Sequence, residues 1–133
     1  MKQKLNTILL IDDDKAVNFI HRHIINKAAI ANTIVTMLNG QTALNYLTTK
    51  QDGKYPQPEL IFLDINMPVM DGWEFLKEFK KINYSKKSKI IIMLTTSINP
   101  AERERATNTA LISDFKHKPL TVEMLEGIME TYF

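Results

Sequence analysis

The chain contains no cysteine. That absence excludes a disulfide framework, a thiolate metal site and a cysteine nucleophile, and it is typical of proteins from reducing compartments. Long apolar runs are missing too. The run behind the N-terminal lysines, Ile8 to Ile11, is too short for a signal peptide, and no other run has the length of a membrane span. We therefore expect a soluble cytoplasmic protein with no membrane partner.

An excess of charge of one sign is also absent. The 133 residues carry 17 Lys and Arg against 15 Asp and Glu, a formal net charge of +2. The lysines gather between Lys77 and Lys89, in a pattern typical of the solvated end of a helix and its loop. A nucleic-acid surface spreads basic residues over a face with aromatic residues among them, so we expect no nucleic-acid partner. The length suits one core, and we expect a single domain over residues 1–133.

Short apolar runs alternate along the chain with segments of helical periodicity. The runs are rich in β-branched residues and end in polar ones, as buried parallel strands do. Strands are predicted at 7–11, 32–37, 60–63, 89–94 and 114–118, and helices at about 15–28, 41–49, 73–82, 100–110 and 121–131. This alternation predicts an α/β fold, a doubly wound five-stranded parallel sheet with five helices on its two faces. We take its strand order to be the flavodoxin-like one, 2-1-3-4-5.

Two of the predicted helices have informative details. Asp14 is a good N-cap for the first, whose predicted inward stripe includes His21, a residue more often satisfied within a core than used as a ligand. The helix that opens at Asn99-Pro100 has charge on most sides and only a thin alanine face, so it is either solvated or a docking surface. The other members of the first helix's stripe are Val17, Ile20, Ile24 and Ala28, and Phe19 projects to the opposite side.

Polar residues stand where the predicted strands end. In open α/β sheets the site lies beyond the carboxyl ends of the strands, and the predicted order makes the first and third strands neighbours. Asp12 and Asp13 should therefore lie beside Asp64. Three crowded carboxylates repel one another, so that one takes up a proton unless a cation lies among them, and Mg²⁺ suits such oxygen ligands.

Asp64 ends the apolar run LIFLD, and the stiff Met67-Pro68 pair soon after it forces a loop before the next helix. Thr95 and Lys118, which end the fourth and fifth predicted strands, should flank this carboxylate. A cation, an ammonium and a hydroxyl around one carboxylate form a clamp for a phosphoryl group. Asp64 is thus predicted to be a nucleophile that forms an aspartyl-phosphate.

The chain resembles the receiver domain of bacterial two-component response regulators, the CheY-like family, from about Asn6 to its C-terminus. The resemblance lies in ILLIDDD, in LIFLDINMPVMDG, in the threonine after IIML, and in Phe115 and Lys118-Pro119 of FKHKP. Three positions depart from the family pattern. Thr96 is bulkier than usual, Ala110 to Ser113 replace a common Gly-Ala pair, and the polar fifth strand contains Lys116 and His117.

The resemblance implies roles for individual residues. Asp64 would be the phosphoacceptor. Asp12 and Asp13 would be the acidic pair of the Mg²⁺ site, with Asp13 as the direct ligand, and Asp64 and the backbone carbonyl of Asn66 would complete the set. Lys118 would bind the phosphoryl group.

Further implied roles concern how a signal leaves the site. Thr95 would be the switch hydroxyl and Phe115 an aromatic that rotates inward when the phosphoryl group is bound. The Lys118-Pro119 bond would be cis. The altered surface would be the face of the fourth helix, fifth strand and fifth helix, where a basic set suggests an acidic downstream protein target.

The resemblance also implies partners and a role. A histidine kinase, a phosphotransfer protein or a small donor would supply the phosphoryl group. The protein would catalyse only its own phosphorylation and dephosphorylation, and so would not be an enzyme in the usual sense. We expect a monomer. We also expect no output domain, because the sequence stops at its fifth helix. A stand-alone output module and a phosphorelay shuttle or phosphate sink remain open alternatives.

Other functional classes fit less well. A haloacid-dehalogenase-like phosphatase needs a second aspartate two residues after the nucleophile, and Asn66 cannot donate a proton in that role. A flavodoxin-like flavin binder needs a phosphate-cradling loop after its first strand, and three aspartates there would repel the phosphate. A purely structural interaction domain stays open, and failure to take up phosphate would support it.

Overall fold

The structure is a computed structural model that describes residues 4–82, 89–96 and 99–133. Part of the lysine-rich run from Lys77 to Lys89 falls on residues 83–88 and so lies outside the described residues. The predicted alternation of strands and helices is confirmed, with boundaries that differ by a few residues. The elements are β1 Leu5–Ile11, α1 Lys15–Ala28, β2 Ala31–Met37, α2 Gly40–Leu47, β3 Leu60–Leu63, α3 Gly72–Phe79, β4 Ile90–Thr95, α4 Pro100–Thr107, β5 Asp114–His117 and α5 Val122–Tyr132.

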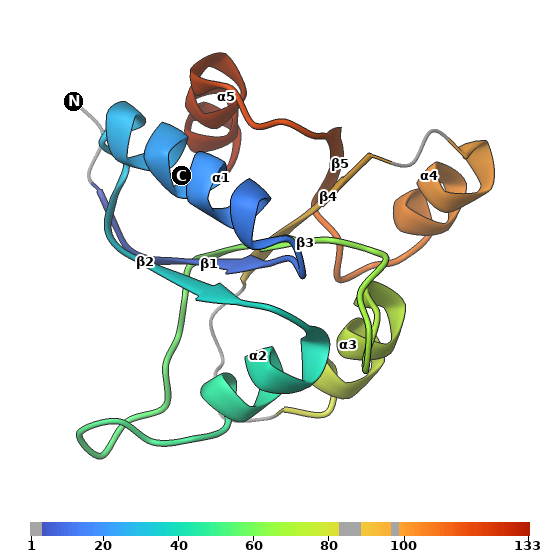
Figure 1. Cartoon of the computed structure of the whole chain (residues 1–133), viewed down its shortest axis with the longest axis horizontal. Helices are drawn as coiled ribbons and strands as arrows, with labels where there is room; N and C mark the ends of the chain where they lie inside the picture. The colour runs from blue at the N-terminus through green and yellow to red at the C-terminus, as the bar shows by residue number, and fades with distance from the viewer. Residues whose placement is uncertain (1–3, 83–88, 97–98) are drawn as a thin grey trace.

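The strands form one parallel sheet in the order β2-β1-β3-β4-β5, as the sequence predicts. Helices α1 and α5 cover one face, and α2 and α3 cover the other (Figure 1). Because every strand runs the same way, all five carboxyl ends lie at one edge of the sheet. Among the described helices none combines the length and the apolar character that a membrane crossing needs.

Alternate residues of the central strands enter two separate cores. In β3, Leu60 and Phe62 pack with α1 and α5, whereas Ile61 and Leu63 pack with α2 and α3. Both faces of the strand are therefore covered, which explains its unbroken apolar sequence. Burial of each large aliphatic or aromatic side chain contributes about 1.5–3 kcal/mol. This packing on two faces fixes the register of β3 and hence the position of the carboxylate that follows it.

The inward face of α1 differs from the predicted stripe. Ile20 is 50% exposed, while Asn18 is buried at 5% exposed. The physical reason is a hydrogen bond: the Asn18 side-chain amide donates to the backbone carbonyl of Asp12 over 2.9 Å, which turns that polar residue toward the sheet. His21 and Ile25 are buried on the same face, and Phe19 is exposed.

Helix α4 has fewer buried residues than any other helix that the structure describes. Asn99 caps it by accepting from the Ala101 N–H over 3.0 Å, as predicted, and Ala106 is its buried residue. The Glu102 carboxylate accepts from the Trp73 indole N–H over 3.0 Å. The Arg105 guanidinium lies 4.2 Å from the centroid of the Trp73 ring, a cation–π contact. Polar and cation–π contacts therefore hold α4 more than apolar burial does.

The irregular stretch before β3, residues 51–59, lies at the opposite edge of the sheet from the acidic residues. Glu59 at its end accepts from the backbone N–H groups of Asn6 and Thr7, with distances of 3.0 to 3.1 Å. The Glu59 carboxylate thus satisfies backbone donors at the start of β1. Its role is structural, and the sequence alone did not reveal it.

Candidate functional site

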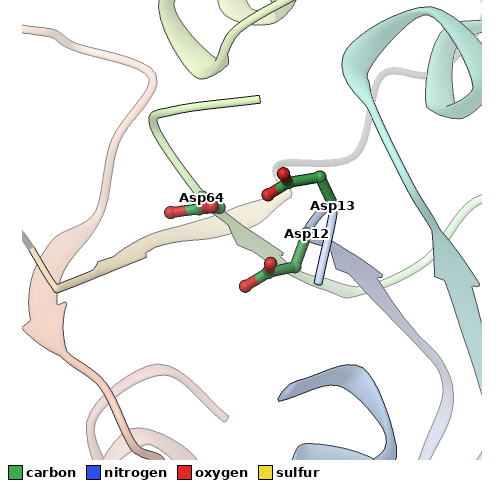
Figure 2. Close-up of side chains that lie close together, drawn as sticks. All are labelled: Asp12, Asp13 and Asp64. Atoms are coloured by element: carbon green, nitrogen blue, oxygen red, sulfur yellow. The ribbon is translucent and has the colours of Figure 1, made fainter. Parts of the chain in front are cut away.

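Three carboxylates converge at the carboxyl edge of the sheet (Figure 2). Asp12 and Asp13 follow β1, and Asp64 follows β3, whose last residue, Leu63, pairs with Ile11 of β1. One oxygen atom from each carboxylate lies within 4.8 Å of the others. Asp12 and Asp64 are buried, at 5% and 7% exposed, while Asp13 is exposed. The predicted meeting of the acidic pair with Asp64 is confirmed.

Backbone contacts fix Asp64 in place. Its N–H donates to the Ile11 carbonyl over 3.0 Å, and its Oδ1 accepts from the Ile65 N–H over 2.9 Å. The Gly72 N–H donates to the Ile65 carbonyl over 2.7 Å, which folds the following loop back on the end of β3. A Cβ atom at Gly72 would overlap the Asp64 carbonyl oxygen. Glycine is needed there because the two backbones approach so closely.

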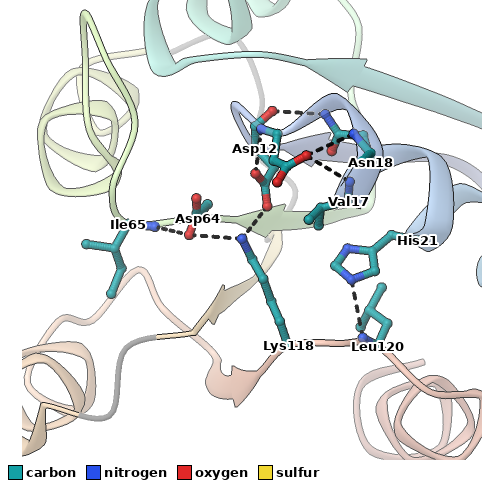
Figure 3. A network of polar contacts seen from close by, with 10 residues as sticks. Asp12, Val17, Asn18, His21, Asp64, Ile65, Lys118 and Leu120 are labelled. Atoms are coloured by element: carbon teal, nitrogen blue, oxygen red, sulfur yellow. Dashed lines mark hydrogen bonds and ion pairs between the residues drawn. The ribbon is translucent and has the colours of Figure 1, made fainter.

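Lys118 joins the acids from the turn after β5 (Figure 3). Its Nζ lies 2.5 Å from Asp12 Oδ2 and 3.3 Å from Asp64 Oδ1. Its backbone N–H donates to the Thr95 carbonyl over 2.9 Å, which ties this turn to β4. The peptide bond between Lys118 and Pro119 is cis, as the resemblance implies. One ammonium thus faces the carboxylates that end β1 and β3.

The local electrostatics favour binding of a cation. Burial, and then the Asp12 carboxylate, raise the pKa of Asp64 to about 6, against the opposing effect of Lys118 and the Ile65 N–H. Burial alone would lower the pKa of Lys118, but hydrogen bonds and charges from Asp12 and Asp64 outweigh it and raise that pKa. Lys118 is therefore charged, yet one ammonium does not balance three carboxylates. A hard divalent cation such as Mg²⁺ fits this set of oxygen donors.

The other predicted site residues lie around this centre. Thr95 is 1% exposed at the end of β4, and Thr96 after it is exposed. Asn66 is exposed in the loop after Asp64. Phe115 on β5 is 8% exposed and belongs to the same core as α2 and α3. The expectation of a solvent-facing Phe115 ring in the unmodified protein is therefore wrong for this structure, because the ring already packs inward.

One buried residue beside the site has a hydrogen-bond partner that the sequence did not predict. His21 of α1 accepts the backbone N–H of Leu120 at its Nε2 over 3.3 Å. Burial lowers the pKa of His21, Lys118 lowers it further, and Asp12 opposes both. Helical periodicity correctly predicted that this histidine is buried, but it could not predict its partner, which is 99 residues away.

Comparison with known proteins identifies the family that shares this arrangement. The model of the family described as the response regulator receiver domain matches residues 8–130. Response regulator Rcp1 of Synechocystis is 34% identical over 128 residues, which are 91% of this chain and 84% of Rcp1.

Solved structures agree with this match. A two-component response regulator from Cytophaga hutchinsonii superposes with a TM-score of 0.85 at 31% identity, covering 96% of both chains. The Mn²⁺-bound form of response regulator Rcp1 superposes with a TM-score of 0.76 at 26% identity, covering 96% of this chain and 94% of that one. The likeness therefore extends over nearly the whole chain in both structures.

The close approach at Gly72 predicts a position-specific cost. Gly72→Ala should lower the free energy of unfolding by about 1–3 kcal/mol, because the new methyl group collides with backbone. Gly127→Ala is the matched control: beyond its chain neighbours and the backbone of α5, an added Cβ meets no atom within 4 Å, and alanine there should stabilise by about 0.5–1 kcal/mol. Urea unfolding measures both, and a Gly72→Ala variant as stable as wild type would contradict the packing described.

The raised pKa of Asp64 predicts a pH-dependent stability. Between pH 3.8, the ordinary pKa of this group, and about pH 6, its pKa here, the folded state binds more protons than the unfolded state. Stability therefore falls as pH rises through this window. Without divalent cations, Asp64→Asn should be more stable than wild type at pH 7.5 by about 1 kcal/mol, a figure reduced for solvent screening at the rim.

At pH 4 that difference between the two proteins should disappear. Thermal unfolding in a chelating buffer measures it, and Asp71→Asn, at the N-cap of α3, controls for the loss of a carboxylate elsewhere. A stability difference for Asp64→Asn that stays constant from pH 4 to 7.5 would show that burial of this charge is not costly.

Proposed function

The chain belongs to the response regulator receiver family, and from that premise we propose that Asp64 accepts a phosphoryl group in a Mg²⁺-dependent reaction. Receiver domains interact with histidine kinases or phosphotransfer proteins, and acetyl phosphate is a small donor of the same group. An oxygen of Asp64 attacks phosphorus, the bond from phosphorus to the donor breaks, and an acyl phosphate forms. The observation that carries the proposal is the buried Asp64 carboxylate beside Asp12, Asp13 and the Lys118 ammonium.

The acidic residues would hold the metal ion. Asp12, Asp13 and Asp64 offer carboxylate oxygens within reach of one ion, and the backbone carbonyl of Asn66 is proposed as a further ligand. Bound Mg²⁺ supplies positive charge that offsets the carboxylates and the phosphoryl oxygens. Asp12 already accepts from the Asp14 N–H over 2.9 Å and from Lys118, so we propose Asp13 as the stronger direct ligand. The Mn²⁺-bound form of Rcp1 supports a divalent cation in this family.

Lys118 and Thr95 would act on the phosphoryl group. Lys118 Nζ is 3.3 Å from Asp64 Oδ1, so its charge lies where phosphoryl oxygens would arrive. The pKa of Asp64, about 6, leaves the carboxylate ionised and able to attack at neutral pH. Thr95 would contribute its hydroxyl by a charge-assisted hydrogen bond. The protein would thus promote its own phosphorylation and dephosphorylation, with no separate substrate to turn over.

The signal would leave through Thr95, Phe115 and α4. We propose that Phe115 exchanges between an outward position and the inward one seen here, and that phosphorylation favours the inward one. The Arg103 guanidinium of α4 lies 5.7 Å from the centroid of the Phe115 ring, so movement of the ring would change this contact with α4. The weak apolar anchoring of α4, through Ala106, would let this helix respond.

The output surface would be the face formed by α4, β5 and α5. Arg103, Arg105 and His117 are exposed there, and Lys116 is partly exposed with its Nζ 3.4 Å from Asp114 Oδ2. This basic set would suit an acidic protein target, bound by a monomer. A phosphorelay shuttle or phosphate sink is the alternative role. Profiling phosphotransfer from the histidine kinases and phosphotransfer proteins of the same cell would separate the two.

Phosphorylation should depend on Asp64 and on the metal ligands. With acetyl phosphate and Mg²⁺, intact-mass analysis should show one added phosphoryl group on wild type and none on Asp64→Asn, because the nucleophile is lost. Asp13→Asn should need a higher Mg²⁺ concentration for half-maximal labelling than Asp12→Asn. Asp71→Asn, which changes a carboxylate at the cap of α3, should label normally.

Chelation should abolish labelling of the wild-type protein. Undiminished labelling of Asp64→Asn would sink the assignment of the nucleophile. Equal Mg²⁺ requirements for Asp12→Asn and Asp13→Asn would reject the proposed ranking of the ligands.

The switch predicts a change at one aromatic ring. Adding beryllofluoride, a phosphoryl mimic, with Mg²⁺ should shift the ring resonances of Phe115 in NMR spectra and reduce their exchange broadening, because one ring position becomes dominant. Phe62, which is 2% exposed on β3 and faces the opposite core, is the internal control and should change little. A Phe115 ring with the same environment in both states would refute the switch.

A further inference from the structure

Helix α1 carries two buried polar side chains that reach backbone on both sides of the acidic site. Asn18 and His21 lie three residues apart, so they share one face of the helix. The Asn18 amide donates to the Asp12 carbonyl over 2.9 Å, on the loop after β1. His21 Nε2 accepts from the Leu120 N–H over 3.3 Å, on the turn after β5. The helix therefore bridges the acidic loop and the turn that carries Lys118 (Figure 3).

The hydrogen bond to His21 restrains the turn that carries Lys118 from the side of α1, whereas the sheet restrains it from the side of β4. Before Pro119, the Lys118 N–H donates to the Thr95 carbonyl over 2.9 Å and ties the turn to β4. After Pro119, the Leu120 N–H donates to His21 and ties the turn to α1. Leu120 is 1% exposed, so its N–H has little access to water as an alternative acceptor. The backbone of Lys118 is thus held from both sides.

The histidine is suited to this role in its neutral form. An imidazole that accepts at Nε2 carries its proton on Nδ1. Burial and the nearby Lys118 ammonium both lower the pKa of His21, although Asp12 opposes them. The acceptor form therefore predominates near neutral pH. A methionine of similar size would fill the space but could not accept this hydrogen bond well.

We propose that His21 is a positioning residue for Lys118, whose ammonium it places beside Asp64 by accepting the Leu120 N–H. The proposal rests on the proposed function, in which Lys118 binds the phosphoryl group. His21 touches none of the reacting atoms. The proposed metal ligands belong to the loops after β1 and β3, so loss of the His21 acceptor should disturb phosphoryl binding and spare metal binding.

Three substitutions at His21 test this separation. His21→Met fills the site without a good acceptor, His21→Asn has an amide too short to reach Leu120, and His21→Gln presents a carbonyl oxygen at about the distance of Nε2. With saturating Mg²⁺ and acetyl phosphate, the first two should be phosphorylated roughly fivefold more slowly, and His21→Gln should be restored to near the wild-type rate. The Mg²⁺ dissociation constant, measured by calorimetry, should stay within about twofold in all three.

A double-mutant cycle identifies the residue through which His21 acts. Lys118→Met should slow phosphorylation more than His21→Met does, and adding His21→Met to Lys118→Met should cause no further loss. If the double variant slowed phosphorylation by the product of the two single effects, the proposal would be overturned. It would also be overturned by a normal rate in His21→Met, or by a loss of Mg²⁺ affinity as large as the loss in rate, which would indicate general disruption.

An NMR measurement decides the matter without phosphorylation. The side-chain ammonium resonance of Lys118 in the Mg²⁺-loaded protein should shift in His21→Met and His21→Asn and return in His21→Gln. If wild type takes up no phosphoryl group, the proposed function fails, and this resonance still tests the positioning role. An ammonium resonance that is unchanged in all three variants would reject that role.

Discussion

The ammonium of Lys118 between two buried carboxylates is the interaction on which the site depends. Its Nζ lies 2.5 Å from Asp12 and 3.3 Å from Asp64, at the ends of two adjacent strands. Burial penalises each of these charges, so the pair of acids can be kept inside only because a cation faces them. The third carboxylate, Asp13, is exposed and adds negative charge that this ammonium does not offset. The cluster of carboxylates could therefore bind a further cation.

The rest of the fold supplies the rigidity that this arrangement needs. Packing on both faces of β1 and β3 fixes where the acids leave the sheet, and the close approach of Gly72 to the end of β3 leaves Asp64 little freedom. The turn that carries Lys118 is tied to β4 by one backbone hydrogen bond, and the Leu120 N–H after it donates to the His21 side chain of α1. The carboxylates follow β1 and β3 and the ammonium follows β5, while α1 contacts both sides of the site through Asn18 and His21.

Helix α4 contrasts with this rigid centre. Ala106 is its buried residue, Glu102 and Arg105 contact Trp73, and the Arg103 guanidinium lies over the Phe115 ring. Such contacts are each weaker than a buried aliphatic side chain and are easily exchanged for water. An element attached in this way can change position at low cost, which is what the proposed signalling role requires of it.

The sequence by itself determined the element order, because apolar runs and polar strand ends are local signals. Under the flavodoxin-like strand order it also placed Asp12, Asp13 and Asp64 together. It also placed Lys118 at the site. Tertiary structure alone decided that Asn18 replaces Ile20 on the inward face of α1 and that Phe115 is packed inward. The same holds for the bond from Leu120 to His21, which lies 99 residues away. These contacts depend on which backbone groups other elements leave without a hydrogen-bond partner, and helical periodicity does not show those groups.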